Sequence, residues 1–333
     1  MKKINFAVIG SGSWGTALAL LLARKGFKVY LWGRDEKQIK YMQDFRINPK
    51  HLKEYPLDSN IIPTFNIEDI YKNCKIIVNA IPTQSIRGFY EKYKKYFADK
   101  LIINASKGIE NKTLKLIDEI FFDIFNSKNN FAYLSGPSFA EEVVLKKPTA
   151  VTISSYNEEL SRKCQLYFNS DYFRVYYETD VKGVLLGGAM KNVIAIAAGI
   201  LEGLNLGLNS VAALITRGLA EIRRLGEKMG ANSLTFSGLS GLGDLVLTCY
   251  GKLSRNRKVG FLLGKGENLS NILKNLGEVA EGVYTCTAAY ELGKKLNVDL
   301  PITNEVYKIL YENKSPFKAL QELMQRTLKH EKD

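Results

Sequence analysis

Near its start the chain places three glycines, Gly10, Gly12 and Gly15, between an apolar strand and an apolar helix. In a strand, loop and helix of this kind, the first glycine permits a tight turn and the second lets the backbone approach a pyrophosphate. The third allows the helix to pack closely on the strand. The loop amides and the positive end of the helix then face the phosphates. The loop therefore predicts a dinucleotide-binding site; the alternative is a turn whose glycines hold no ligand.

Short apolar strands alternate with helices through the first half of the chain. The expected strands cover residues 6–9, 28–32, 76–80, 101–105, 131–134, 150–154 and 173–177. The expected helices cover residues 15–24, 35–44, 85–97 and 113–125. Such alternation is typical of a mostly parallel sheet with helices on both faces, so we predict an α/β fold with a doubly wound, Rossmann-type sheet.

Strand signals fade after about Val181, where long helical runs take over at residues 188–204, 210–229 and 285–296. At 333 residues the chain is long for one hydrophobic core, since single cores stop growing at roughly 250 to 300 residues. We therefore predict a dinucleotide-binding domain over residues 1–181. An all-α domain that binds substrate and carries the catalytic groups is expected over residues 182–333.

The run over residues 184–204 is apolar enough to suggest a membrane span. However, Lys191, Asn192 and Glu202 interrupt it, and charged side chains are costly inside a bilayer. We predict a buried central helix and no membrane span.

The net charge of +13 is compatible with a nucleic-acid footprint or with a lysine-rich surface that attracts anionic metabolites. The densest basic run covers residues 91–97, and aromatic residues at 90, 93 and 96 or 97 recur there at helical spacing. That spacing is typical of a stripe that faces the core beneath a solvated lysine face, so we expect no nucleic-acid partner.

Four cysteines and two histidines restrict the chemistry of this chain. The cysteines stand singly at 74, 164, 249 and 286, without the paired spacing of a zinc or redox site, and they suit a reducing cytosol. Because the sequence contains only two histidines, at 51 and 330, a multi-histidine metal centre is excluded. We predict a cytoplasmic protein without a metal site, whose chemistry falls on lysine, carboxylate or hydroxyl groups. The first nine residues are interpreted as the first strand, because a glycine loop interrupts any signal-peptide pattern.

An arginine and an acid follow the second expected strand. NAD-preferring folds often place an acid there to bind the ribose hydroxyls, whereas an arginine accommodates the 2′-phosphate of NADPH. Arg34 stands near that phosphate position, with Asp35 next to it. Both NADPH and NADH are compatible with this pattern, which favours NADPH. In the alternative interpretation Asp35 meets a ribose and Arg34 is merely exposed.

Two polar motifs leave the ends of expected strands, where doubly wound sheets bind ligands. They are NASKGIE at residues 104–110 and SGPSFAEE at residues 135–142. Ser138 and Glu141 have capping-box spacing, which predicts a second helix start suited to an anion.

The helical half carries further polar groups. Lys191 is expected near the start of an apolar helix, where it either reaches the surface or is desolvated, with a lowered pKa suited to proton exchange. Arg255 and Asn256 either bind a phosphate or belong to a solvated turn.

Together these segments closely resemble the bacterial NAD(P)-dependent glycerol-3-phosphate dehydrogenases. The resemblance covers nearly the whole chain and rests on motifs in one order: GSGSWGTALA, NASKGIE, LSGPSFAEEV, GGAMKNVIAIAAGI, ITRGLAEIRRLG, TFSGLSGLGDLVLTC, SRNRKVG, VAEGVYT and LPIT. It implies reversible reduction of dihydroxyacetone phosphate to sn-glycerol 3-phosphate by hydride transfer, with NADPH or NADH as cofactor. It also implies a homodimer and a supply of glycerophospholipid precursors.

The resemblance assigns roles position by position. The implied catalytic residues are Lys191, Lys107 and Asp244. The implied substrate-binding residues are Lys107, Gly136, Ser138, Lys191, Asp244, Ser254, Arg255 and Asn256. The implied cofactor-binding residues are Gly10, Gly12, Ser13, Trp14, Gly15, Arg34, His51, Lys107, Ala140, Arg255, Val279 and Glu281. His51 departs from the family, in which tyrosine commonly precedes the leucine, so its cofactor contact stays open.

In the implied mechanism Lys191 stabilises and then protonates the carbonyl oxygen, and Lys107 shares the stabilisation. We expect Asp244 to orient Lys191 or to bind a substrate hydroxyl, the alternative being a helix cap. Thr248 and Asn192 resemble supporting polar groups. Two rival functions are a related dehydrogenase acting on another hydroxy acid or sugar acid, and a nucleotide-sensing protein without turnover.

Overall fold

The structure of the protein is a computed structural model that describes residues 4–277, 279–328 and 330–331. Its first half contains an eight-stranded sheet in the order β3-β2-β1-β4-β5-β6-β7-β8, parallel except where β7 runs against β6. The strands are β1 (Asn5–Ile9), β2 (Lys28–Trp32), β3 (Ile61–Thr64), β4 (Ile76–Asn79), β5 (Leu101–Asn104), β6 (Phe131–Ser135), β7 (Thr149–Ser154) and β8 (Phe173–Glu178). Every expected strand is present with ends shifted by at most one residue, which confirms the doubly wound α/β fold.

The first six strands have the order 3-2-1-4-5-6 that is typical of dinucleotide-binding sheets. The direction in which strands are added reverses between β1 and β4, which pair in parallel from Phe6 and Ile76 to Ile9 and Asn79. Ligands of such sheets bind in the crevice outside the carboxyl ends of these two strands. The glycine loop follows β1 directly, so the fold places it at this crevice.

The edge strand β3 was not predicted from the sequence. Pro63 weakens the strand signal of its short apolar run, because proline donates no hydrogen bond to a sheet ladder. β3 lies at the sheet edge beside β2, where this loss is tolerated, and Pro63 O accepts a hydrogen bond from Gln43 Nε2 at 2.8 Å.

Eight helices accompany the strands in the described part of this half: α1 (Ser13–Arg24), α2 (Glu36–Phe45), α3 (Ile67–Asn73), α4 (Thr83–Lys92), α5 (Lys94–Phe97), α6 (Ile117–Phe125), α7 (Ala140–Val144) and α8 (Glu158–Phe168). The predicted helix over 85–97 is divided at Tyr93. The one predicted over 113–125 begins only at Ile117, since Leu114 has a left-handed φ of 60°. Tyr90 and Phe97 are buried, as the core-facing stripe predicted.

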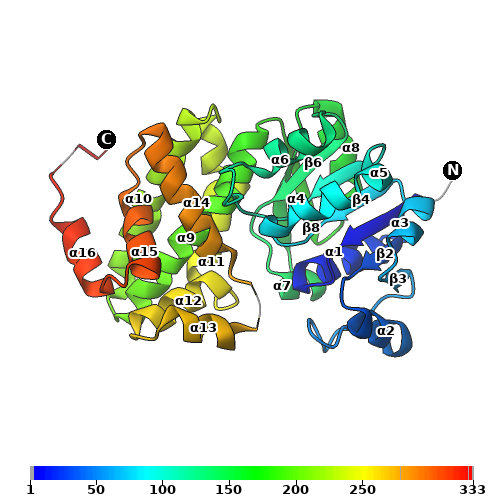
Figure 1. Cartoon of the computed structure of the whole chain (residues 1–333), viewed down its shortest axis with the longest axis horizontal. Helices are drawn as coiled ribbons and strands as arrows, with labels where there is room; N and C mark the ends of the chain where they lie inside the picture. The colour runs from blue at the N-terminus through cyan, green and yellow to red at the C-terminus, as the bar shows by residue number, and fades with distance from the viewer. Residues whose placement is uncertain (1–3, 278, 329, 332–333) are drawn as a thin grey trace.

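The second half is helical, as predicted, and lies beside the sheet with the two termini at opposite ends of the molecule (Figure 1). Its helices are α9 (Val181–Gly203), α10 (Gly207–Lys228), α11 (Asp244–Tyr250), α12 (Arg255–Gly264), α13 (Leu269–Leu276), α14 (Glu281–Leu296), α15 (Pro301–Tyr311) and α16 (Pro316–Met324). A 3₁₀ turn (Ser233–Ser237) and a π turn (Leu239–Gly243) lead into α11.

The central helix α9 is long and apolar enough to cross a membrane, and its apolar window is 100% buried inside the protein. The prediction of a buried central helix is therefore confirmed. Its predicted start at residue 188 is wrong, because the Asp180 carboxylate accepts from the backbone N–H of Gly183 and caps a helix that begins at Val181. Lys191 consequently lies in the middle of α9.

Two glycines bring α9 and α12 into backbone contact. A Cβ added to Gly199 of α9 would lie 2.0 Å from Arg257 O, and one added to Gly260 of α12 would lie 1.9 Å from Ile196 O. Neither position has room for a side chain. The close crossing fixes the start of α12 relative to α9.

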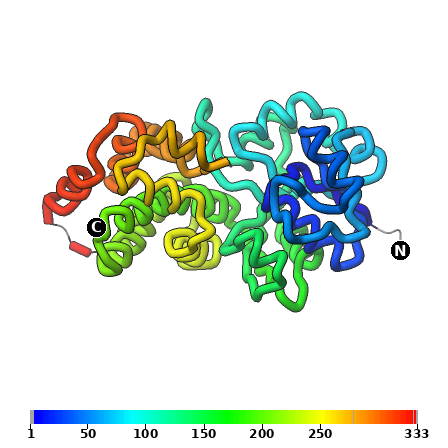
Figure 2. The backbone as a smooth tube through the Cα atoms, turned by 90° about the horizontal axis from the view of Figure 1, so that it is seen from below, coloured from blue at the N-terminus to red at the C-terminus, as the bar shows by residue number. Residues whose placement is uncertain are grey.

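The sheet has a different core on each face. Phe6, Val8 and Leu31 pack with α1 on one face, whereas Ile9 and Ile77 belong to a core that continues into α9 and the other helices. Figure 2 shows the helical half, coloured from green to red, beside the sheet half. β8 ends at Glu178 and α9 begins at Val181, and the division into domains at residue 181 stays a prediction.

Candidate active site

The glycine loop has the geometry that dinucleotide binding needs. Gly10 has a φ of 117°, and a Cβ there would lie 2.7 Å from Ala80 O. A Cβ on Gly15 would lie 1.8 Å from Gly10 O, so that glycine serves the packing of helix on strand. By contrast, a Cβ on Gly12 would meet nothing within 4 Å. The backbone at Gly12 is thus open to a ligand, beside the positive end of α1.

Two side chains at the start of α1 tie the glycine loop to its neighbours. Trp14 Nε1 donates to Ala105 O at 3.1 Å, which joins the loop to the segment after β5 that carries Lys107. Ser13 Oγ lies 3.3 Å from His51 Nδ1. His51 therefore contacts the glycine loop, and its contact with the cofactor stays a prediction.

The segment that carries His51 is anchored by Asn48, a residue that sequence reasoning did not select. The side chain of Asn48 is fully buried, and its Nδ2 donates to Ser11 O and Thr16 Oγ1 at 2.9 Å each. Its Oδ1 accepts from His51 N at 3.2 Å. An asparagine next to a proline is typical of a surface turn, so the local sequence gave no sign of this burial.

At the position where the sequence analysis expects the adenosine ribose, Arg34 follows β2 and is exposed. Asp35 is the N-cap of α2, since its Oδ1 accepts from Gln38 N at 3.2 Å. Its other oxygen, Oδ2, accepts from Lys50 Nζ at 2.5 Å. Both carboxylate oxygens of Asp35, the acid beside the expected ribose position, thus already have a partner: one caps α2 and the other pairs with Lys50.

The three predicted catalytic side chains meet between the sheet and the helical half. Lys191 Nζ lies 2.6 Å from Asp244 Oδ1, and Lys107 Nζ lies 2.6 Å from Asp244 Oδ2. Asp244 is fully buried and Lys191 is 8% exposed. Two ammonium groups and one carboxylate leave a net charge of +1, which suits an oxygen on which negative charge develops.

Burial changes the acidity of Lys191. Desolvation lowers its pKa from 10.5 to about 8, the carboxylate of Asp244 opposes this shift, and the charge of Lys107 adds to it. Thr248 Oγ1 accepts a second hydrogen bond from Lys191 Nζ at 2.9 Å, as expected for a supporting group. The lysine is held in one place and is close to half-protonated at mildly alkaline pH, which suits proton exchange.

Asp244 does not act as a helix cap. Gly243 occupies the N-cap of α11, and both carboxylate oxygens of Asp244 face the lysines. The expectation that Asp244 orients Lys191 agrees with this arrangement.

Buried asparagines that the sequence analysis did not assign support the loop carrying Lys107. Asn79 Nδ2, at the end of β4, donates to Asn104 Oδ1 at 2.8 Å, and Asn104 Nδ2 donates to Ser106 O at 2.9 Å. The Tyr90 hydroxyl donates a hydrogen bond to Asn79 Oδ1 at 3.3 Å. The sequence offered one sign of this network: an asparagine ends each of two apolar strands, and the ends of adjacent parallel strands meet at one sheet edge.

The loop after β6 faces Lys107 through its backbone. Lys107 Nζ donates to Gly136 O at 2.9 Å, and Gly136 has a left-handed φ of 132° with Val151 Cα in the way of any Cβ. The predicted capping box at Ser138 is wrong: α7 begins at Ala140, and Ser138 Oγ donates to Gly136 O at 3.0 Å instead. A five-residue helix also offers little dipole to an anion.

The predicted phosphate-binding segment forms the start of α12 and not a solvated turn. Ser254 caps the helix by accepting from Arg257 N, and Arg255 is exposed in its first turn. Asn256 is buried, with Nδ2 donating to Asn192 Oδ1 at 2.8 Å and Oδ1 accepting from Gly282 N at 2.9 Å. Asn256 therefore joins α9, α12 and α14, and its contact with substrate stays a prediction.

Glu281, the first residue of α14, reaches across to the sheet half. Its Oε1 accepts from Thr83 N at 3.2 Å, whereas Oε2 is buried and has no hydrogen-bond partner among the described residues. Desolvation raises the pKa of Glu281 from 4.5 to about 7, and the charge of Arg255 opposes the shift. A buried acceptor without a partner fits a site completed by a ligand. Val279, two residues earlier, is exposed.

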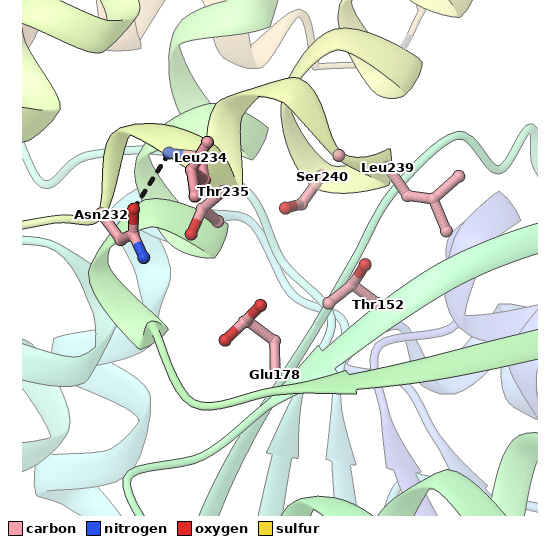
Figure 3. A pocket seen from close by; sticks show the side chains of 8 residues that line it. Thr152, Glu178, Asn232, Leu234, Thr235, Leu239 and Ser240 are labelled. Carbon is pink, nitrogen blue, oxygen red and sulfur yellow. Dashed lines mark hydrogen bonds between the residues drawn. The ribbon is translucent and has the colours of Figure 1, made fainter.

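A separate cavity of about 280 Å³ is lined by residues of β7 and β8 and of the turns before α11. Figure 3 shows the side chains of Thr152, Glu178 and Ser240 around one space. Its lining comes from residues 152, 178, 232, 234, 235 and 238–240, so it is distinct from the lysine cluster.

Comparisons with known proteins identify the family of this chain. Residues 5–161 match the model of the NAD-dependent glycerol-3-phosphate dehydrogenase N-terminus, and residues 180–321 match that of its C-terminus. The chain is 47% identical to glycerol-3-phosphate dehydrogenase [NAD(P)+] of Leptospira biflexa, covering 98% of this chain and 99% of the relative. It is 49% identical to the enzyme of that name from Citrifermentans bemidjiense, with 98% of each covered.

Among solved structures, the chain resembles the crystal structure of glycerol-3-phosphate dehydrogenase from Coxiella burnetii. The TM-score is 0.93 at 38% identity, over 97% of this chain and 99% of the other. Family models that cover both halves, together with relatives of near-equal length, show that the chain belongs to the NAD-dependent glycerol-3-phosphate dehydrogenase family.

Proposed function

We propose that this chain catalyses the reversible NAD(P)-dependent reduction of dihydroxyacetone phosphate to sn-glycerol 3-phosphate. Its family makes it an oxidoreductase that uses a nicotinamide cofactor. The observation that carries the proposal is the cluster of the half-buried Lys107 with the buried Lys191 and Asp244, beside the dinucleotide loop. Trp14 connects the two, because it bonds the backbone two residues before Lys107.

The residues of the glycine loop fit a dinucleotide. Gly12 leaves its backbone open, and the first turn of α1 offers amides to a pyrophosphate. The Oε2 of Glu281, which is buried and has no partner among the described residues, offers a further acceptor close to Thr83, after β4. We assign cofactor binding to the predicted set: Gly10, Gly12, Ser13, Trp14, Gly15, Arg34, His51, Lys107, Ala140, Arg255, Val279 and Glu281.

When bound, the nicotinamide supplies a hydride to the central carbonyl carbon of the substrate. Lys191 donates a charge-assisted hydrogen bond to the carbonyl oxygen as negative charge builds there, and then transfers its proton to give the hydroxyl. Lys107 stabilises the same oxygen. Asp244 keeps both ammonium groups in position. In the reverse reaction, neutral Lys191 accepts the hydroxyl proton.

The substrate phosphate binds at the start of α12 in this proposal. Arg255 supplies a guanidinium in the first turn, and the helix N-terminus adds its positive end. Gly136, Ser138, Ser254 and Asn256 complete the proposed substrate contacts. The phosphate is remote from the reacting carbon. Binding it at α12 therefore holds that carbon against the cofactor, and this positioning contributes to the rate.

The test is turnover of dihydroxyacetone phosphate by the purified full chain, followed by loss of reduced-nicotinamide absorbance with NADPH and with NADH. Turnover with either cofactor supports the proposal. Cofactor binding without turnover of this substrate would favour a nucleotide-sensing protein. Faster turnover of another keto acid or sugar acid would favour a related dehydrogenase.

The remaining parts of the proposal concern the setting of the reaction. We place the chain in the cytoplasm as a homodimer that works mainly toward reduction, prefers NADPH and supplies glycerophospholipid synthesis. The singly placed cysteines, which are all buried, support a reducing compartment. Sedimentation equilibrium of the purified chain tests the dimer.

A further inference from the structure

The turn between β2 and α2 carries opposed charges at the position where a bound dinucleotide places its adenosine ribose. Arg34 offers a cation to a 2′-phosphate, but Asp35 follows it directly. An uncompensated carboxylate there binds the two hydroxyls of NADH and repels the phosphate of NADPH. Whether the site prefers NADPH or NADH therefore depends on whether another group neutralises the charge of Asp35.

Lys50 compensates that charge from another segment. Its Nζ donates to Asp35 Oδ2 at 2.5 Å, while Asp35 Oδ1 remains bonded to Gln38 N. The hydrogen bond from Lys50 is the largest cause that lowers the pKa of Asp35, so the carboxylate is charged and paired. With Lys50 in place, the turn and its partner carry a net charge of +1, against zero without it.

The position of Lys50 is fixed by buried structure, although its side chain is exposed. The buried Asn48 accepts from Lys50 N at 3.2 Å through Oδ1 and donates from Nδ2 to Ser11 O in the glycine loop. Gln38 Nε2, on α2, donates to the same Oδ1 at 2.9 Å. Asn48 thus joins the lysine segment, the pyrophosphate loop and the helix that Asp35 caps.

We propose that Lys50 is a specificity-determining residue, which gives the cofactor site its preference for NADPH over NADH by offsetting Asp35 beside Arg34. This inference deepens the proposed function and rests on it. Because Lys50 reaches Asp35 from another segment, the turn after β2 can keep Asp35 as the cap of α2 and still bind a 2′-phosphate.

The first test replaces the lysine by an uncharged side chain of similar length. Lys50→Met is expected to lower the ratio of kcat/KM for NADPH to that for NADH roughly tenfold, because it leaves one uncompensated negative charge, that of Asp35, beside the 2′-phosphate. The matched control is Lys40→Met on α2, which removes an equally exposed lysine that pairs with Glu36. An unchanged ratio in Lys50→Met, or an equal loss with both cofactors, would overturn the proposal.

A double variant tests whether Lys50 acts through Asp35. Asp35→Asn keeps a side-chain oxygen to cap α2. In Lys50→Met with Asp35→Asn, the NADPH preference should recover at least half of its loss, because no uncompensated charge remains. Failure to recover would contradict compensation as the mechanism.

A binding measurement separates this inference from the proposed function. Calorimetry with adenosine 2′,5′-bisphosphate and with AMP needs no turnover, and Lys50→Met should weaken binding of the bisphosphate only, again roughly tenfold. Equal weakening of both nucleotides would argue against Lys50. If the unaltered chain does not reduce dihydroxyacetone phosphate but Lys50→Met still shows this selective loss of bisphosphate binding, the proposed function fails and the role of Lys50 stands.

Discussion

The ammonium nitrogen of Lys191 lies 2.6 Å from a carboxylate oxygen of Asp244, which begins another helix 53 residues later in the chain. The pair is buried, and the second oxygen of Asp244 accepts from Lys107. One carboxylate therefore sets the position of two lysines. Their positions relative to each other, more than either lysine alone, make the site suited to a carbonyl oxygen.

The lowered pKa of Lys191 predicts opposite pH profiles for the two directions. Reduction needs the protonated lysine, so kcat should fall as the pH rises through about 8, and oxidation should rise over the same range. Asp244→Asn removes a charge that raises the pKa of Lys191, so the alkaline limb of the remaining reduction activity should move to lower pH. Initial rates across pH with saturating substrates measure both. A limb that moves upward in Asp244→Asn would contradict the assigned coupling.

Lys191→Ala should abolish most turnover without preventing cofactor binding. Loss of one preorganised donor typically costs about 10²- to 10³-fold in kcat, and here the proton source is lost as well. Fluorescence titration with NADPH provides the control, because the proposed function assigns Lys191 to the substrate and not to the cofactor. Near-normal kcat would remove Lys191 from the mechanism.

Arg255→Ala should mainly weaken substrate phosphate binding. We expect KM for dihydroxyacetone phosphate to rise about tenfold or more, the effect of one hydrogen bond to a charged group. Arg257→Ala is the matched control two residues along the same helix, since Arg257 pairs with Glu202. Equal effects of the two changes on KM would show that the phosphate is held elsewhere.

Glu221 predicts a pH dependence of stability remote from the site. Its carboxylate is buried and accepts from Ile302 N and from the N–H and hydroxyl of Thr303 at the start of α15. Desolvation raises its pKa from 4.5 to about 7. Between these values the folded chain holds a proton that the unfolded chain has released, so the free energy of unfolding falls as pH rises from about 4.5 to about 7.

Urea unfolding at pH 5 and pH 8 measures this loss, which amounts to at most about 3 kcal/mol for one such group. Glu221→Gln stays uncharged, so its unfolding free energy should fall less between the two pH values. Other titrating groups, Glu281 included, act equally in both proteins and cancel in the comparison. An equal fall in both proteins would show that Glu221 titrates normally.

Gly260→Ala should destabilise the helical half. Its Cβ would lie 1.9 Å from Ile196 O, so α12 would have to move away from α9, at a cost of about 1–3 kcal/mol or more. Gly88→Ala in α4 is the control, because a Cβ there meets nothing within 4 Å and alanine favours a helix. Thermal unfolding should show a lower Tm only for Gly260→Ala. A comparable decrease in both would indicate a helix-propensity effect and not a close crossing.

The sequence predicted best those features that depend on neighbouring residues. The apolar strands and the spacing of Gly10, Gly12 and Gly15 identified the dinucleotide fold, because one loop supplies the turn, the phosphate approach and the packing. The sequence-based predictions failed where one local pattern is compatible with two different structures. Ser138 and Glu141 have capping-box spacing without forming a cap, and Pro63 obscured an edge strand that its position in the sheet tolerates.

The order of residues along the chain determined which groups this protein has for its chemistry: a phosphate-binding loop, lysines and one aspartate in recognisable motifs. Only the tertiary structure decided that Asp244 lies between Lys107 and Lys191, and that Lys50 pairs with Asp35. The reason is physical. Lys191 is desolvated because α9 is buried inside the protein, and this desolvation lowers its pKa. Charges that are distant in sequence come close together only when strands and helices pack.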